Sequence, residues 1–224
     1  MCGVLVVIYL QKRGDKVDFD QCLNDLSTVL KIIDKDNKDL PIFILGESMG
    51  GAIALQLTSE YPNLVTGLIC SVPAGSRYKA SSTNLDVAIH LVKGINRPFD
   101  IGTKIVGQAT KEERLRKEWS ADPFNRLYLS PKELLEFASF MSKNKTSASK
   151  IKNTPVLVFQ GVQDKLVKAK GTLEIYNSIA SQDKDLVLIG SSEHLIFENT
   201  KCPLSALSGI LGWMQSHSQK PNLN

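Results

Sequence analysis

The stretch Leu40–Leu55, LPIFILGESMGGAIAL, joins two apolar runs through a turn of small residues. The first run, Pro41–Leu45, has the composition of a buried strand, and Ser48–Ser59 has the spacing of a helix. Between the two runs, Gly46–Gly50 match the pattern G-x-S-x-G. The sequence therefore predicts a strand, a sharp turn and a helix, with Ser48 at the turn.

The alternation of strand and helix continues on both sides of this stretch. Apolar runs predict further buried strands at Gly3–Leu10, Val65–Val72, Thr154–Gly161 and Lys184–Gly190. Helical spacing predicts helices over Phe19–Ile33, capped by Asp18 or Asp20, over Gly171–Ala180 and over Leu204–Gln215. The charged run Asp34–Asp39 is interpreted as an exposed loop. Such alternation favours an α/β fold, with a mostly parallel sheet flanked by helices and joined by right-handed crossovers.

The alternation stops between Pro73 and Asn153. This region contains amphipathic helical segments and no convincing strand; the helical segments are Leu85–Lys93, Lys111–Trp119 and Pro131–Met141. Met141–Asn153 is interpreted as a polar, basic link. An insertion of about 80 residues exceeds a simple connection, and we expect it to cover the carboxyl ends of the strands. We assign residues 1–75 and 154–224 to the core and residues 76–153 to a helical cap or lid.

Composition excludes several classes of protein. The 224 residues carry a net charge of +4, and no Lys/Arg block alternates with aromatics, which argues against a nucleic-acid partner. The four cysteines lack CxxC spacing, which argues against a zinc site and a disulfide scaffold; they are Cys2, Cys22, Cys70 and Cys202. Gly3–Leu10 is too short to span a bilayer and lacks the flanks of a leader peptide. We therefore expect a cytoplasmic protein.

Ser48 is the candidate nucleophile. A G-x-S-x-G pattern between a strand and a helix is typical of a nucleophile elbow, in which the serine points out above the strand ends. Gly46 and Gly50 are expected to avoid clashes at the turn, while Gly51 and Ala52 keep the helix close to the sheet. The N-terminus of that helix favours negative charge. The alternative is a glycine-rich turn that only packs a helix against a sheet.

A serine nucleophile needs a base, and the base needs a group that orients it. His194 directly follows the predicted strand Lys184–Gly190, so its side chain is able to face Ser48. His90 falls in a predicted helix of the insertion and His217 falls in the tail. We take His194 as the base and interpret the other two histidines as surface residues.

The orienting acid is expected at the end of a neighbouring strand. Asp164 follows Thr154–Gly161 and satisfies this condition. Glu193 and Glu198 are the alternatives. Glu193 adjoins His194, so its side chain is expected to point elsewhere, and Glu198 lies four residues further on, in an expected helical turn. We therefore take Asp164 as the acid.

Together these segments resemble a known family. From Phe19 to the end, the chain is similar to α/β hydrolases of the monoacylglycerol lipase and lysophospholipase type, through GESMGGAIALQL, GLICSVPAG, PVLVFQGVQDKLV and SSEHLIFE. The resemblance implies a serine hydrolase that cleaves carboxylic esters, often of single-chain lipids, without metal or cofactor. Ser48 would attack the acyl carbon, His194 would take and return its proton, and Asp164 would stabilise the imidazolium. The Met49 backbone N–H would be one oxyanion donor.

The family pattern begins earlier than this sequence. It has three strands before the one that matches Gly3–Leu10, and a His-Gly loop that supplies the second oxyanion donor. In the turn after the predicted strand Gly3–Leu10, only Arg13 and Gly14 match the family pattern. We expect an N-terminally shortened hydrolase whose first strand pairs with Ile42–Leu45, or whose exposed sheet edge pairs with another chain. Losing one oxyanion donor costs about 10²–10³ in kcat.

Two functions follow from these observations. The first is an active esterase or lipase on a monoacylglycerol or lysophospholipid, with thioesters and amides compatible with the same chemistry. The alternative is a truncated hydrolase-like protein with little turnover, which binds a lipid or a partner. Within the insertion, DVAIHLVKGI and FDIGTKIVG either line an acyl tunnel or pack on each other. The lysines of the predicted link contact anionic lipid heads at a membrane surface or are simply solvated; they are Lys143, Lys145, Lys150 and Lys152.

Overall fold

A four-stranded parallel sheet forms the centre of the protein. The computed structural model describes residues 16–73, 77–78, 80–123, 125–198 and 202–218. In these residues the strand order is β1-β2-β5-β6, with β1 at Phe43–Glu47, β2 at Gly67–Ser71, β5 at Val156–Gly161 and β6 at Lys184–Ile189. All three pairings are parallel. This arrangement confirms the predicted α/β class.

The two central strands are buried along their whole length. Leu68 of β2 pairs with Val156 of β5, although the whole insertion separates them in the chain. Buried strands need apolar residues on both faces, which explains why most residues of both segments are apolar.

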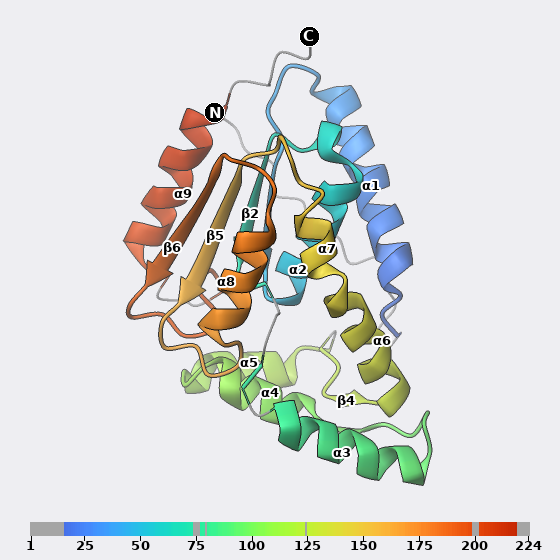
Figure 1. Ribbon diagram of the computed structural model, residues 1–224. Coiled ribbons are helices and arrows are strands. Elements are labelled where there is room, and N and C mark those ends of the chain that lie inside the picture. Colours follow the sequence, from blue (N-terminus) through green and yellow to red (C-terminus); the bar gives the residue numbers. More distant parts are fainter. Residues whose placement is uncertain (1–15, 74–76, 79, 124, 199–201, 219–224) are drawn as a thin grey trace.

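Helices cover both faces of the sheet (Figure 1). On one face, α2 (Met49–Glu60), α7 (Asn144–Ala148) and α8 (Ala169–Ser178) pack over β2 and β5. On the other face lies α9 (Leu204–Ser216), whose Trp213 joins the core cluster there. An outer helix, α1 (Phe19–Asp36), packs on α2 through Leu23 and Leu30. A short 3-10 helix, η1 (Pro62–Leu64), follows α2.

The first helix begins and ends at definable signals. Asp18, one of the two candidate caps, accepts a hydrogen bond from the Gln21 N–H at 3.0 Å. The helix continues to Asp36, so the prediction of a loop over Asp34–Asp39 is wrong for its first three residues. A charged segment is able to form either an exposed loop or the exposed last turn of a helix, and composition alone does not distinguish these two structures.

The insertion lies beyond the carboxyl ends of the strands (Figure 1). It contains α3 (Ala80–Lys93), α4 (Gly102–Ala109), α5 (Glu113–Ala121) and α6 (Pro131–Ser142). The expectation of no strand here is wrong, because β3 (Phe99–Asp100) pairs antiparallel with β4 (Tyr128–Leu129). Two-residue strands are too short to leave a periodic pattern.

The predicted polar link is also wrong. Met141–Asn153 contains the end of α6 and the whole of α7, and Ala148 and Ile151 belong to the core. The Gln56 side-chain amide donates hydrogen bonds to the Phe140 carbonyl at 3.0 Å and to Asn144 Oδ1 at 2.7 Å. These buried polar groups satisfy one another, so a segment that is polar in sequence packs inside the protein.

Some predictions concern residues outside the described ranges. The strand Gly3–Leu10 and its pairing with Ile42–Leu45 are among them, and they stay predictions, as does association through a sheet edge. The division into residues 1–75, 76–153 and 154–224 also stays a prediction. In the described part of the chain, no helix is both long and apolar enough to cross a membrane.

Candidate active site

Ser48 lies at the turn between β1 and α2 in a strained backbone conformation. Its φ of 55° and ψ of −117° fall outside the regions that non-glycine residues usually adopt. The Ser48 N–H donates to the Ser71 carbonyl at 2.9 Å, which anchors the turn to the end of β2. Val72, the next residue after β2, also has a positive φ, of 38°. Strain of about 1–3 kcal/mol per residue is typical of functional sites.

The glycines in and after the motif differ in how much space surrounds them. A β-carbon on Gly46 would overlap the Gly50 backbone, so this position requires glycine. A β-carbon on Gly51 would lie 3.1 Å from the Gly46 carbonyl oxygen and 3.2 Å from that of Ser71, which keeps α2 close to the sheet. By contrast, a β-carbon on Gly50 would meet nothing within 4 Å. The expectation that Gly50 also relieves a clash is therefore wrong.

The structure brings the three predicted side chains together. His194 Nε2 lies 2.7 Å from Ser48 Oγ, and His194 Nδ1 lies 2.8 Å from Asp164 Oδ2. His194 is 1% exposed and Asp164 is 6% exposed. A carboxylate only accepts hydrogen bonds, so Nδ1 donates to Asp164 and Nε2 is left to accept from the serine hydroxyl. The arrangement suits proton transfer from serine to histidine.

Asp164 is held by the loop in which it lies. Its Oδ1 accepts hydrogen bonds from the backbone N–H groups of Leu166 at 2.7 Å and Val167 at 2.9 Å. The Gln160 amide lies 3.5 Å from Oδ2, and its own Oε1 accepts from Thr172 Oγ1 at 2.6 Å. Oδ1 of Asp164 thus accepts hydrogen bonds from the backbone of its own loop, while Oδ2 faces His194.

The loop that carries His194 packs tightly on the end of β5. A β-carbon on Gly161 would overlap the carbonyl oxygen of Glu193 and would lie 2.6 Å from that of Ser192. Glycine at 161 therefore allows the 192–193 backbone to approach the strand end, which places the following residue, His194, above the sheet.

Sequence reasoning missed Glu47, the variable residue before Ser48. Its carboxylate accepts a hydrogen bond from Ser71 Oγ at 2.7 Å and others from the backbone N–H groups of residues 196–198. The only signal in the sequence is a charged residue directly after an apolar strand. Ser71 lies 24 positions later and the backbone partners 149 to 151 positions later, so no local pattern predicts them.

The two alternative acids have other partners. Glu193 turns toward the insertion, where its Oε2 accepts from the Lys111 N–H at 2.7 Å and its Oε1 lies 3.4 Å from Lys111 Nζ. This confirms that its side chain points away from His194. Glu198 lies in an irregular segment, so the expected helical turn is wrong. Partial burial and then the nearby Glu47 carboxylate raise the pKa of Glu198.

The other two histidines lie elsewhere. His90 stacks on Phe99 with ring centroids 3.9 Å apart, and its Nδ1 lies 2.8 Å from the Asp86 carbonyl oxygen. His217 ends α9, where its Nε2 lies 3.2 Å from Asp183 Oδ2. Neither ring is a partner of Ser48 in these contacts.

Met49, the predicted oxyanion donor, is the first residue of α2. The first backbone N–H groups of a helix have no partner inside it and point toward the region where anions bind. In the described residues, no group of three or more His, Cys, Asp or Glu side chains is arranged to hold a metal ion.

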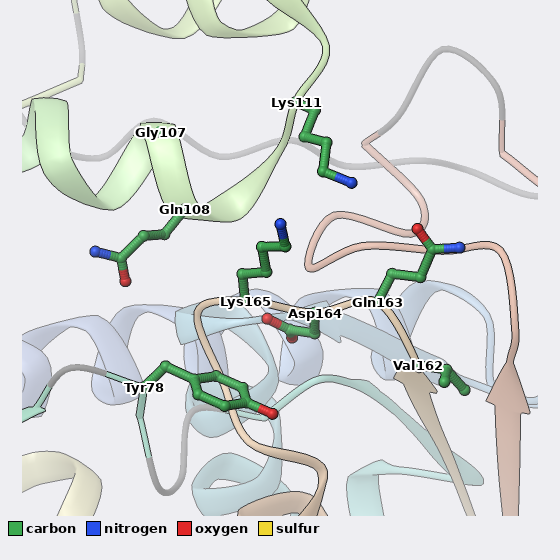
Figure 2. A pocket seen from close by; sticks show the side chains of 8 residues that line it. All are labelled: Tyr78, Gly107, Gln108, Lys111, Val162, Gln163, Asp164 and Lys165. Atoms are coloured by element: carbon green, nitrogen blue, oxygen red, sulfur yellow. The ribbon is translucent and has the colours of Figure 1, made fainter.

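A cavity of about 610 Å³ lies between the insertion and the loop after β5. Figure 2 shows Gly107, Gln108 and Lys111 on one side and residues 162–165 on the other. Asp164 lines this cavity, whereas Ser48 and His194 do not. The cavity therefore adjoins the hydrogen-bonded side chains but does not open directly on the serine.

The sheet, the strained serine between β1 and α2 and the histidine that follows β6 together define the α/β-hydrolase class of serine hydrolases. The chain belongs to the family described as "Serine aminopeptidase, S33", which matches residues 10–201.

Individual relatives carry lipase names. The chain is 24% identical to the monoacylglycerol lipase of Mycolicibacterium smegmatis, over 92% of this chain and 73% of that protein. It is 26% identical to the monoglyceride lipase of Mus musculus, over 91% of this chain and 69% of that protein. Among solved structures, it is similar to Saccharomyces cerevisiae monoglyceride lipase, a soluble variant in complex with a substrate analog. That match has a TM-score of 0.74 and 23% identity, and it covers 93% of this chain and 72% of the other. This likeness shows the fold.

Proposed function

We propose that this chain is a serine esterase or lipase that cleaves carboxylic esters of single-chain lipids. The observation that carries the proposal is the unbroken line of hydrogen bonds from Ser48 through His194 to Asp164. A serine hydroxyl is a weak nucleophile by itself, and this arrangement supplies both the base and the group that orients the base.

In the proposed reaction, Ser48 Oγ attacks the acyl carbon while His194 Nε2 takes the hydroxyl proton. The oxygen of the tetrahedral intermediate accepts from the Met49 N–H at the start of α2. His194 then gives its proton to the leaving alcohol, which departs and leaves an acyl-enzyme on Ser48. Water, deprotonated by His194, releases the acid. Throughout, the Asp164 carboxylate stabilises the imidazolium and does not itself take the proton.

The names of relatives support the substrate class. Besides the lipases above, phospholipase YtpA of Bacillus subtilis is 31% identical over 65% of this chain and 57% of that protein. We therefore propose monoacylglycerol or lysophospholipid-like esters as substrates. The family description names an aminopeptidase, so an amide with the same acyl group is the appropriate competitor.

Labelling with a fluorophosphonate, followed by hydrolysis assays, tests the proposal. The purified chain should react covalently at Ser48 and hydrolyse monoacylglycerol or lysophospholipid faster than a thioester or an anilide of matched acyl length. Ser48→Ala should abolish labelling and lower kcat by about 10⁶-fold. A folded protein that hydrolyses anilides and not esters would contradict the proposed leaving group.

The alternative is a hydrolase-like chain with little turnover that binds a lipid or a partner. The chain covers 73% and 69% of the two lipases named above. Lack of labelling in folded protein that still binds a fluorescent monoacylglycerol analogue would favour it.

Contact with a membrane surface through the basic residues near α7 also stays a prediction. Lys145 already pairs with Glu174 at 2.6 Å, and Lys143 lies 4.0 Å from Asp20. These pairs favour the alternative of a solvated basic surface. Sedimentation with anionic and neutral vesicles distinguishes the two.

A further inference from the structure

Glu47 connects the serine turn to the histidine loop. It is the last residue of β1 and directly precedes Ser48. Its carboxylate Oε1 accepts from Ser71 Oγ at 2.7 Å and from the Ile196 N–H at 2.9 Å. The Phe197 N–H lies 3.2 Å from Oε1 and 3.3 Å from Oε2, and the Glu198 N–H donates to Oε2 at 3.0 Å. One carboxylate therefore receives the backbone N–H groups of three consecutive residues.

These donors begin two residues after His194. The intervening chain is tightly enclosed, since Leu195 is 1% exposed and Ile196 is 0% exposed. Hydrogen bonds to a charged acceptor are about twice as strong as neutral ones. Leu195, the single residue between His194 and Ile196, is buried and has little space in which to adjust, so we expect a displacement of residues 196–198 to move the imidazole as well.

We propose that Glu47 is the residue that positions His194 against Ser48. Glu47 is bonded covalently to Ser48 and through hydrogen bonds to the loop of His194, so it fixes both ends of the 2.7 Å contact between Nε2 and Oγ. Glu47 does not touch the reacting atoms. The inference rests on the proposed function, since it assigns a part in the same reaction.

The loss expected without Glu47 follows from geometry. A misplacement of about 1 Å costs on the order of 10²-fold in rate. Glu47→Gln keeps the shape and one acceptor oxygen, but its amide group faces a backbone N–H donor. Glu47→Ala removes both oxygens. We therefore expect kcat to fall in the order Glu, Gln, Ala, by about 10-fold for Gln and about 10²-fold for Ala, while KM stays within about twofold.

Glu133 provides a matched control for a merely structural carboxylate. It is 8% exposed and accepts from the Ser130 N–H at 2.9 Å and from Ser130 Oγ at 2.7 Å, at the start of α6. Arg126 also pairs with it. Glu133→Gln should lower the melting temperature as Glu47→Gln does, without lowering kcat.

The experiment measures kcat, KM, fluorophosphonate labelling rate and melting temperature for the wild type, Glu47→Gln, Glu47→Ala, Glu133→Gln and Ser48→Ala. Proton NMR adds a direct readout, because the proton on His194 Nδ1 that bonds to Asp164 resonates downfield of the amides. That signal should broaden or disappear in Glu47→Gln and persist in Glu133→Gln.

Folded Glu47→Gln and Glu47→Ala with wild-type kcat and an unchanged downfield proton would overturn the inference. Equal losses of kcat in Glu47→Gln and Glu133→Gln would also overturn it, since the effect would then follow stability alone. If Ser48→Ala retains the activity, the proposed function fails instead, which is a different outcome of the same panel.

Discussion

Gly161 and Glu193 are in direct backbone contact, and the Glu193 carbonyl oxygen occupies the space that a β-carbon on Gly161 would need. The end of β5 and the loop before His194 are therefore packed at the closest approach that the chain allows. Asp164 follows the same strand end and His194 follows Glu193, so we expect a change at this contact to alter the 2.8 Å distance between the two side chains.

Gly161→Ala should displace the 192–193 backbone and lower both stability and turnover. Overlap with backbone atoms cannot be relieved by a side-chain rotation, and overpacking costs about 1–3 kcal/mol. Gly190→Ala is the control, because a β-carbon there meets nothing within 4 Å. Thermal unfolding and ester hydrolysis of the two variants check the prediction, and equal behaviour of both would contradict it.

Gly46→Ala and Gly50→Ala should have opposite outcomes, although both glycines belong to G-x-S-x-G. A β-carbon at 46 overlaps the backbone of Gly50, so Gly46→Ala should lose serine labelling and unfold at a lower temperature. Gly50 lies in the first turn of α2 with open space around it, and alanine there should stabilise the helix by up to about 1 kcal/mol. A Gly50→Ala variant less stable than the wild type would show that the space is filled.

Asp164→Asn should keep the fold and lower kcat by about 10⁴-fold. Asparagine retains an oxygen for the Leu166 and Val167 N–H groups, but it does not stabilise an imidazolium as a carboxylate does. The fluorophosphonate labelling rate should fall in parallel, with an unchanged melting curve. If Asp164→Asn retains most of its activity, another acid orients His194, and Glu198→Gln then becomes the variant to measure.

Cys70 should give the protein a pH-dependent loss of stability in the alkaline range. Burial raises its thiol pKa from 9.0 to about 12. The unfolded chain therefore releases this proton first, so the contribution of Cys70 is fully present below pH 9.0 and is lost as the pH rises toward about 12.

Urea unfolding of the wild type and Cys70→Ala at a series of pH values measures this effect. The stability advantage of the wild type should shrink above pH 9.0, by up to about 1.4 kcal/mol per pH unit. A constant difference between the two proteins would contradict the pKa shift. Iodoacetamide should also leave Cys70 unmodified in the native protein at pH 8.

The sequence predicted the features that depend on local patterns. The segments around Ile69 and Val158 are mostly apolar and rich in β-branched residues, so the prediction of a parallel sheet followed from them. The sequence also suggested that Ser48, Asp164 and His194 would meet, because each follows a strand whose carboxyl end lies at the same edge of the sheet. The structure contains the hydrogen bonds that join these three side chains. Their roles in a reaction stay a prediction.

The features that escaped prediction depend on contacts between distant segments. Asn144 is polar, but its burial follows from Gln56, which lies on another helix. The same holds for Glu47, whose partners are Ser71 and the backbone of residues 196–198. The prediction for Gly50 was wrong for the opposite reason. The motif suggested that a side chain at this position would clash, but the path of α2 leaves open space there.

The direct pairing of Leu68 with Val156 means that the sheet itself sets no length for the insertion between these two strands. Loop-closure free energy changes by only about 0.6 kcal/mol for each doubling of loop length, so a change in the length of the segment between β2 and β5 costs little chain entropy. The limit to exchanging this segment is its packing on the core. Ala148 and Ile151 fill the core beside β5, and Ala109 and Leu115 pack with Leu166, Val167 and Leu195. A chimera that joins foreign helices upstream of Asn144 would keep the pairing of β2 with β5. It would hold the loops of Asp164 and His194 in place only if the new helices also packed against Leu166, Val167 and Leu195.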